Sequence, residues 1–456
     1  MSEQQHPAIP RPKSPAIPRP TSDVSAGVGL IGVAGLFAWI MICRSWPGLA
    51  DMFALPGPRA PLSGPYAALA GLVCAGLPMV IWSVAFDKVH RDPATGIDWD
   101  KPRPIREIAD ISITKLAGLW ATWAVIGFLY CVARWYWQGS YLFAMEVLAA
   151  AAIPLFVLSI PYVLWLDRVL VNPRDGAWNF GAMLIGREAF DPAAVMRHLR
   201  AWAVKGFFTA FMISILPGGF SGVVETDFAA ILANPALLSN RLMELMFVID
   251  AQIGTVGYVL TMRPLASQIR SANPYLAGWV AALVCYPPFQ LMSYGQPLYY
   301  GTATESWSYW LAGQTALLWL WGGLLVGLSA FYAWATFAFG IRFSNLTYRG
   351  VLTGGPYRFT RHPAYLAKNS FWWLAALPFL VTNGSMVDAV RNTVFLACVS
   401  AIYFWRARTE EKHLLSEDPK YREYYDWMEQ NALITRSFNR LGKWALGNRI
   451  QSSSPA

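Results

Sequence analysis

Charged residues are scarce in this sequence. Asp, Glu, Lys and Arg make up only 14% of the 456 residues, whereas 55% are hydrophobic. A soluble domain carries about 25% charged residues. No long stretch of this chain is polar enough to form a domain with a water-facing surface. The composition therefore excludes a multidomain soluble enzyme. It also excludes a disordered protein, because disorder requires a low content of hydrophobic residues.

Cysteine is also scarce and shows no paired spacing. Neither a disulfide framework nor a metal site is predicted from such a set. The 36 Lys and Arg exceed the 27 Asp and Glu by nine, but they cluster between apolar runs. That distribution is typical of a protein held against an anionic membrane leaflet, and we expect no nucleic-acid partner. The five cysteines are Cys43, Cys74, Cys131, Cys285 and Cys398.

Long apolar runs are abundant. A helix needs about 20 mostly apolar residues to cross the hydrocarbon layer, and about ten such runs occur. The last two runs are short and are joined by residues 382–385, which predicts a tight helical hairpin. We therefore expect an all-α fold, a polytopic transmembrane helical bundle of about ten spans. They are centred near residues 24–42, 66–86, 116–136, 141–166, 204–223, 242–262, 275–294, 315–339, 366–381 and 390–405.

Basic residues alternate between successive loops. Lys and Arg are enriched in cytoplasmic loops of membrane proteins, and here every second loop is basic. This pattern predicts that both termini are cytoplasmic, in either a plasma membrane or an endoplasmic reticulum. We divide the chain into a disordered, Pro-rich cytoplasmic tail (1–23), N-terminal transmembrane helices (24–310), a C-terminal membrane domain (311–430) and a basic interfacial tail (431–456).

Three acidic residues, Glu146, Glu244 and Asp250, fall inside predicted spans. Ionisable groups are costly in hydrocarbon and often mark an ion or proton path. The alternative is a polar group that turns to a neighbouring helix. No Lys or Arg matches these acids at the same membrane depth, so we favour the second interpretation.

The most informative segment is 342–368, which reads RFSNLTYRGVLTGGPYRFTRHPAYLAK. It places several cations at the cytoplasmic mouth of the bundle, interleaved with glycine, proline and tyrosine. Glycines let backbone N–H groups face a ligand, and tyrosine rings can stack on a planar one. The predicted hairpin returns a second cluster, Arg406 with Glu410 and Glu411, to the same membrane face. We therefore expect the basic loop and the carboxylate pair to meet.

These two clusters carry a family resemblance. The run GGPYRFTRHPAYL at 354–366, a hydrophobic hairpin, and then R-x3-EE-x2-L with Tyr-x2-Tyr resemble the isoprenylcysteine carboxyl methyltransferase family and its phospholipid methyltransferase relatives. The resemblance covers about residues 339–427, with Ala367 where the family commonly has glycine. It implies a methyltransferase-like domain at 311–430 that holds S-adenosyl-L-methionine in a cytoplasmic pocket. It also implies a lipid or lipidated acceptor that enters from the bilayer, and it leaves the oligomeric state open.

Site residues follow from the resemblance by position. Glu410 suits the ribose hydroxyls or ammonium of the cofactor, and His362 suits its carboxylate. Arg406 matches the catalytic position that orients an anionic acceptor against the sulfonium methyl. The motif offers no base besides Glu410 and Glu411, which favours an oxyanion or thiolate acceptor. The implied cofactor contacts are Arg349, Gly350, Val351, Leu352, Tyr357, His362, Pro363, Ala364, Tyr365 and Glu410.

Two other function classes are open. Membrane sterol reductases have about ten spans, bind NADPH in their C-terminal half and carry a similar RH-x-N-Y turn, but Ala364 stands at the Asn position here. A transporter would suit the many spans and predicts an internal repeat, but the GGPYR run has no counterpart near the middle of the chain. The methyltransferase is therefore the favoured function.

Overall fold

The computed structural model describes residues 18–437, and these are almost entirely helical. In this range the single sheet is an antiparallel pair, β1 (Ser271–Ala272) with β2 (Thr347–Tyr348). The all-α prediction is therefore confirmed. Most of the predicted Pro-rich tail and of the basic interfacial tail lies outside the described residues. The helices are α1 (Ala26–Met52), α2 (Pro65–Ala85), α3 (Ile105–Val132), α4 (Tyr141–Val169), α5 (Gly176–Ile185), α6 (Pro192–Glu225), α7 (Phe228–Ile231), α8 (Pro235–Val259), α9 (Leu276–Leu283), α10 (Trp307–Trp310), α11 (Thr315–Phe337), α12 (Pro363–Ala376), α13 (Met386–Glu417) and α14 (Pro419–Asn431).

Within residues 18–437, eight helices are long and apolar enough to cross a membrane: α1, α2, α3, α4, α6, α8, α11 and α13. The count of about ten is not confirmed. The predicted span 275–294 is wrong, because only α9 is helical there and its eight residues reach about 12 Å. Pro287 and Pro288 follow and lack the N–H donors that a helix needs. The predicted span 366–381 corresponds to α12, whose 14 residues are also too few to cross.

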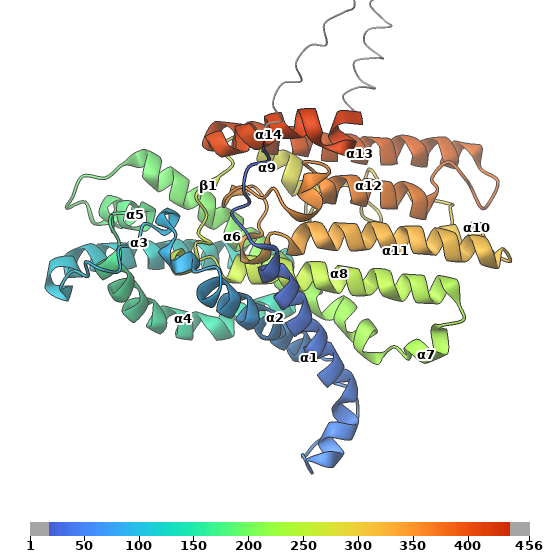
Figure 1. The fold of residues 1–456 in the computed structure, drawn as a ribbon, viewed down its shortest axis with the longest axis horizontal. Coiled ribbons are helices and arrows are strands. Elements are labelled where there is room, and N and C mark those ends of the chain that lie inside the picture. Colours follow the sequence, from blue (N-terminus) through green and yellow to red (C-terminus); the bar gives the residue numbers. More distant parts are fainter. Residues whose placement is uncertain (1–17, 438–456) are drawn as a thin grey trace, which may run out of the picture.

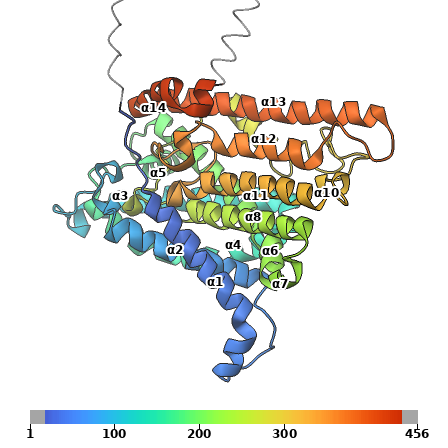
Figure 2. The same ribbon diagram turned by 45° about the vertical axis from the view of Figure 1, so that its right-hand side comes forward.

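The C-terminal hairpin forms with two unequal arms. Its second arm, α13, has 32 residues and begins at a capping side chain, the Ser385 hydroxyl, which accepts a hydrogen bond from the Asp388 N–H at 3.3 Å. Figures 1 and 2 both show α13 lying along α12, with α11 and then α8 beneath them. Because α13 is one continuous helix, Arg406 and the acidic pair are held on the same rigid element as the hairpin arm.

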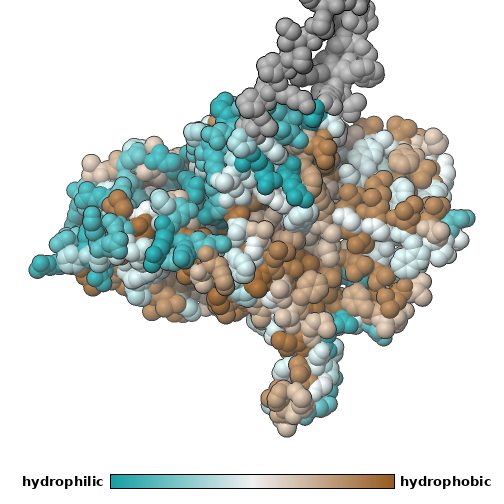
Figure 3. Space-filling model, in the orientation of Figure 1, coloured by the Kyte–Doolittle hydropathy of each residue, from teal (hydrophilic) through white to brown (hydrophobic). Residues whose placement is uncertain are grey.

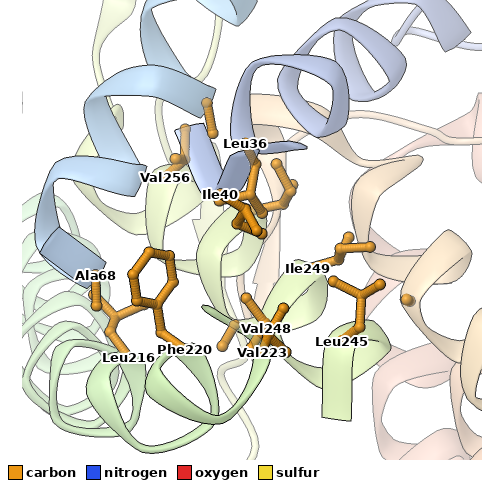
Figure 4. Close-up of a cluster of buried hydrophobic side chains, with 14 of the residues drawn as sticks. Leu36, Ile40, Ala68, Leu216, Phe220, Val223, Leu245, Val248, Ile249 and Val256 are labelled. Carbon is orange, nitrogen blue, oxygen red and sulfur yellow. The ribbon is translucent and has the colours of Figure 1, made fainter. Parts of the chain in front are cut away.

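The main core lies where α1, α2, α6 and α8 meet (Figure 4). Leu36, Phe220 and Ile253 are fully buried in it. Close approach here depends on small residues: a Cβ added at Gly35 would lie 2.1 Å from the Cys74 carbonyl oxygen. Small residues of this kind let membrane helices pack backbone to backbone. The four helices thus form a fixed support on which α8 carries α11 and the C-terminal elements.

The surface separates into polar and apolar regions. Figure 3 shows hydrophilic residues gathered over α14 and the ends of α3 and α5, whereas hydrophobic residues dominate over α8, α11 and α12. On α4, the side chains of Ile153, Leu155 and Leu158 are all exposed. A contiguous apolar surface of this extent would cause aggregation in water and is suited to lipid. The chain is a multi-pass integral membrane protein.

Candidate functional site

A cavity of about 180 Å³ lies where α11, the loop before α12, and the helices α12, α13 and α14 meet. Ten of the eleven site residues predicted from the sequence line it. The exception is Pro363, which is buried at the first turn of α12. The ten that the structure brings together are Arg349, Gly350, Val351, Leu352, Tyr357, His362, Ala364, Tyr365, Arg406 and Glu410.

The loop at Gly350 has a shape that only glycine accepts readily. Its φ is +119°, and a Cβ there would lie 2.8 Å from both Arg342 Nη1 and Asp23 Oδ2. Asp23, just before α1, fastens the next residue, because its Oδ2 accepts a hydrogen bond from the Val351 N–H at 2.8 Å. Its Oδ1 accepts one from the Lys420 ammonium. The segment before α1 therefore holds this wall of the cavity in place.

Arg349 lines the cavity, but its guanidinium is fully used within the protein. All five of its N–H donors bond to backbone carbonyls, and this is the full donor set of the side chain. The residue is 4% exposed. Arg349 therefore fixes the turn that it belongs to and has no free guanidinium donor for a ligand. The accepting carbonyls are those of Gly257, Ser267, Ile341 and Phe343.

The two halves of the sequence motif meet at Glu410. The Tyr365 hydroxyl on α12 donates a hydrogen bond to its Oε1, and Arg406 Nε donates to the same oxygen at 3.2 Å. The rings of His362 and Tyr365 lie parallel, with centroids 5.6 Å apart. The predicted meeting of the basic loop with the carboxylate pair is thus confirmed.

The neighbouring carboxylate, Glu411, has a different role. It accepts from Arg361 Nε at 2.7 Å, from Arg408 Nη1 at 2.8 Å, and lies 3.1 Å from His362 Nε2. Burial alone lowers the pKa of Arg361, but the carboxylates of Glu411 and Glu429 outweigh it and raise that pKa. Charge-assisted bonds of this kind are strong when partly buried. Glu411 therefore fastens the motif loop to α13, while Glu410 faces the cavity.

Arg406 is 2% exposed, and residues outside its own helix hold its guanidinium. Its Nη2 donates to Asn345 Oδ1 at 2.7 Å, and its Nη1 donates to the Tyr286 hydroxyl at 3.3 Å. Asn345 in turn donates from its backbone N–H and its Nδ2 to the Tyr258 hydroxyl on α8. Sequence reasoning missed Tyr258, Tyr286 and Asn345. The one available signal was general, since a buried arginine requires several acceptors.

Helix α14 closes the far wall of the cavity with tyrosines. Tyr421 and Tyr424 both line it, and the Tyr424 hydroxyl donates to the Tyr357 carbonyl at 2.6 Å. Asp418 caps the start of this helix, because its side chain accepts a hydrogen bond from the Lys420 N–H. The Tyr-x2-Tyr spacing thus places one tyrosine where it fixes the turn at Tyr357.

Asp250, on α8, lies behind the cavity lining. As expected from the sequence, it turns to a neighbouring helix: it accepts hydrogen bonds from Tyr332 and Thr336 on α11. The prediction that no cation matches it is wrong, because Lys368 on α12 attracts it electrostatically. Tyr332, Thr336 and Lys368 all line the cavity.

Residues 324–416 match the sequence model of the Isoprenylcysteine carboxyl methyltransferase (ICMT) family. This match confirms the family resemblance, and it lies in the C-terminal part of the chain. No curated protein and no solved structure matches the chain. The C-terminal part is therefore methyltransferase-like, whereas Tyr258, Asp250 and Tyr286 contribute to the site from outside the matched residues.

Proposed function

We propose that this chain is an integral-membrane methyltransferase that uses S-adenosyl-L-methionine and acts on a lipid or lipidated acceptor. The observation that carries the proposal is the contact of Tyr365 and Arg406 with Glu410 inside one cavity. The two motif halves that define the family resemblance meet there, and the family match spans both. The eight apolar helices supply the membrane setting that a lipid acceptor requires.

The cavity offers complementary groups for the cofactor. Glu410 can accept from its ammonium or ribose hydroxyls, while the backbone from Gly350 to Leu352 and the Tyr357 turn form the wall beside it. His362 has its Nε2 held by Glu411, so the orientation of its ring towards the cavity is fixed. Arg349 contributes as a positioning residue, because its guanidinium bonds only to carbonyls.

When bound, the cofactor supplies a methyl group on a sulfonium, which is already a good leaving group. The protein then has to align the acceptor with that methyl and exclude water. Alignment of two reactants can contribute about 7–11 kcal/mol. Arg406 is suited to this task, because Asn345, Tyr286 and Glu410 hold its guanidinium in one orientation. The tyrosines around the cavity exclude water from the reacting atoms.

Ligand-dependent thermal stability tests the proposal on the purified full chain in detergent. A ligand that binds only the native state stabilises it, by about 2.7 kcal/mol at 100 times its Kd. We expect S-adenosylhomocysteine to raise the melting temperature and NADP to leave it unchanged. The reverse result would contradict the proposal and favour the reductase class.

Lipid mass spectrometry then identifies the acceptor. Membranes with and without this chain receive methyl-labelled S-adenosylmethionine, and we expect labelled lipid only where the chain is present. A matched membrane that contains the Glu410→Ala variant controls for other methyltransferases. Equal labelling in all three membranes would contradict the proposed activity.

A further inference from the structure

Behind the α11 side of the cavity, which Tyr332, Thr336, Lys368 and Tyr403 line, lies a carboxylate that the motif does not provide. Asp250 is 7% exposed, and its Oδ2 accepts from the Tyr332 hydroxyl at 3.0 Å. Its Oδ1 accepts from the Thr336 hydroxyl. Both oxygens of this carboxylate thus lie within hydrogen-bond distance of a hydroxyl, and either could receive a proton from it. Tyr332 therefore links a buried base to the cavity.

Lys368 faces this pair without neutralising it. Its ammonium lies 4.9 Å from the Tyr332 ring centroid, 5.7 Å from that of Trp372 and 5.9 Å from that of Tyr403. Within residues 18–437 its Nζ makes no hydrogen bond and no ion pair within 4.0 Å, but it attracts Asp250 at longer range. Because Lys368 forms no ion pair with Asp250, both carboxylate oxygens are left to the hydroxyls.

Three other carboxylates near the cavity are already paired. Glu410 accepts from Arg406 and Tyr365, and Glu411 is bonded to two arginines, Arg361 and Arg408. Asp23 is held by Lys420. Unlike these three carboxylates, Asp250 accepts its side-chain hydrogen bonds from neutral hydroxyls. It can therefore take up a proton without breaking an ion pair.

We propose that Tyr332 and Asp250 form a proton-accepting relay, and that the acceptor is a neutral N–H, O–H or S–H group on the lipid. This inference rests on the proposed function. The acceptor atom forms a bond to the methyl carbon as the carbon–sulfur bond breaks, and that electron pair stays on sulfur. The acceptor proton passes to the Tyr332 oxygen, and the Tyr332 proton passes to Asp250. Charge balances, because the sulfonium becomes a neutral thioether while the carboxylate becomes a neutral acid.

The relay also gives the helices before the family match a role in the reaction. Asp250 belongs to α8, and the groups that face it come from α11 (Tyr332, Thr336) and α12 (Lys368). Tyr286, which follows α9, also interacts with it electrostatically. The site is therefore built across the boundary of the matched residues, and the base lies on the unmatched side.

The rate of methyl transfer as a function of pH tests the relay. Membranes that contain the full chain receive methyl-labelled S-adenosylmethionine, and label in the extracted lipid is followed between about pH 5 and pH 9. For the unaltered chain we expect a rate that rises with pH and then levels. Asp250→Asn and Tyr332→Phe should each lower it by about 10²–10⁴-fold, the range for a general base, and remove the plateau. Thr336→Val, which takes away the other hydrogen bond to the same carboxylate, should keep the plateau.

S-adenosylhomocysteine binding separates this inference from the proposed function. We expect unaltered affinity in Tyr332→Phe, which removes only the relay hydroxyl and so reports even if Asp250→Asn misfolds. A pH-independent rate in the unaltered chain, together with full activity of Tyr332→Phe, would overturn the relay and indicate an acceptor that is already anionic. Failure of the unaltered chain to bind S-adenosylhomocysteine would instead overturn the proposed function, and the relay with it.

Discussion

The phenol of Tyr365 donates a hydrogen bond to Oε1 of Glu410, although the two residues are 45 positions apart in the chain. Arg406 donates to the same oxygen from one helical turn away. Tyr365, which is proposed to contact the cofactor, and Arg406, which is proposed to orient the acceptor, therefore bond to the same oxygen of Glu410. A change at Glu410 is transmitted directly to Arg406, so the two functions can be separated only by measuring binding and turnover independently.

The first prediction concerns cofactor binding. Glu410→Ala and His362→Ala should each weaken S-adenosylmethionine binding by ~1–3 kcal/mol, the cost of losing a polar contact, while the protein still folds. Titration with S-adenosylhomocysteine measures the affinity. Arg408→Ala is the matched control, because it removes an exposed partner of Glu411 and leaves the contact between Glu411 and His362, so the affinity should not change. Unaltered affinity in the first two variants would remove both residues from the cofactor site.

The second prediction separates acceptor orientation from binding. Arg406→Lys keeps the charge and loses the planar fork that reaches Asn345, Tyr286 and Glu410. We expect S-adenosylhomocysteine affinity close to that of the unaltered chain and a large loss of turnover, because the lost interaction acts mainly in the transition state. Single-turnover rates with labelled cofactor, compared with equilibrium titration, give both quantities. An equal loss in the two would place Arg406 in direct contact with the cofactor.

Much of this site was predictable because both halves of the motif, the run at 354–366 and the R-x3-EE pattern at 406–411, can be read directly from the sequence. The motif run and the R-x3-EE pattern placed ten residues that do line one cavity. The different roles of Glu410 and Glu411 were not predictable from the pattern. Successive residues of an α-helix point about 100° apart, so only the neighbours decide which carboxylate faces the cavity and which is buried among cations.

The remainder of the fold shows where sequence reasoning fails physically. Hydropathy placed a span at 275–294, because it records apolar side chains and not the donors that Pro287 and Pro288 lack. Tyr258 and Asn345 escaped notice because their role depends on contact with Arg406, which no spacing in the sequence encodes. The sequence showed that an ionisable group such as Asp250 is costly inside a membrane span. It did not show the cation that attracts Asp250, because Lys368 lies more than 100 residues later, on α12.

The third prediction uses two glycines of the same loop region. Gly350→Ala forces a Cβ to within 2.8 Å of Arg342 and Asp23 at a φ of +119°, which L-residues rarely adopt. We expect a lower melting temperature and weaker binding of S-adenosylhomocysteine, because the cavity wall must shift. Gly354→Ala is the control: its φ is −89°, and an added Cβ would meet nothing within 4 Å. Equal effects of the two substitutions would contradict this account of the loop.

The last prediction concerns Asp23, which ties the segment before α1 to the cofactor loop and to α14. Burial alone raises the pKa of Asp23, but hydrogen bonds from Lys420 and from the Val351 N–H outweigh burial and lower it. A carboxyl group whose pKa is depressed on folding stabilises the protein above its unfolded pKa of about 3.9, and this contribution is lost as pH falls through the folded value. Asp23→Asn should therefore lower the melting temperature at about pH 7, and its difference from the unaltered chain should shrink below about pH 4. Lys420→Ala should mimic it, and the double variant should show less than the sum of the two effects, because the residues share one ion pair. A difference that stays constant from neutral to acidic pH would contradict the ion pair as its source.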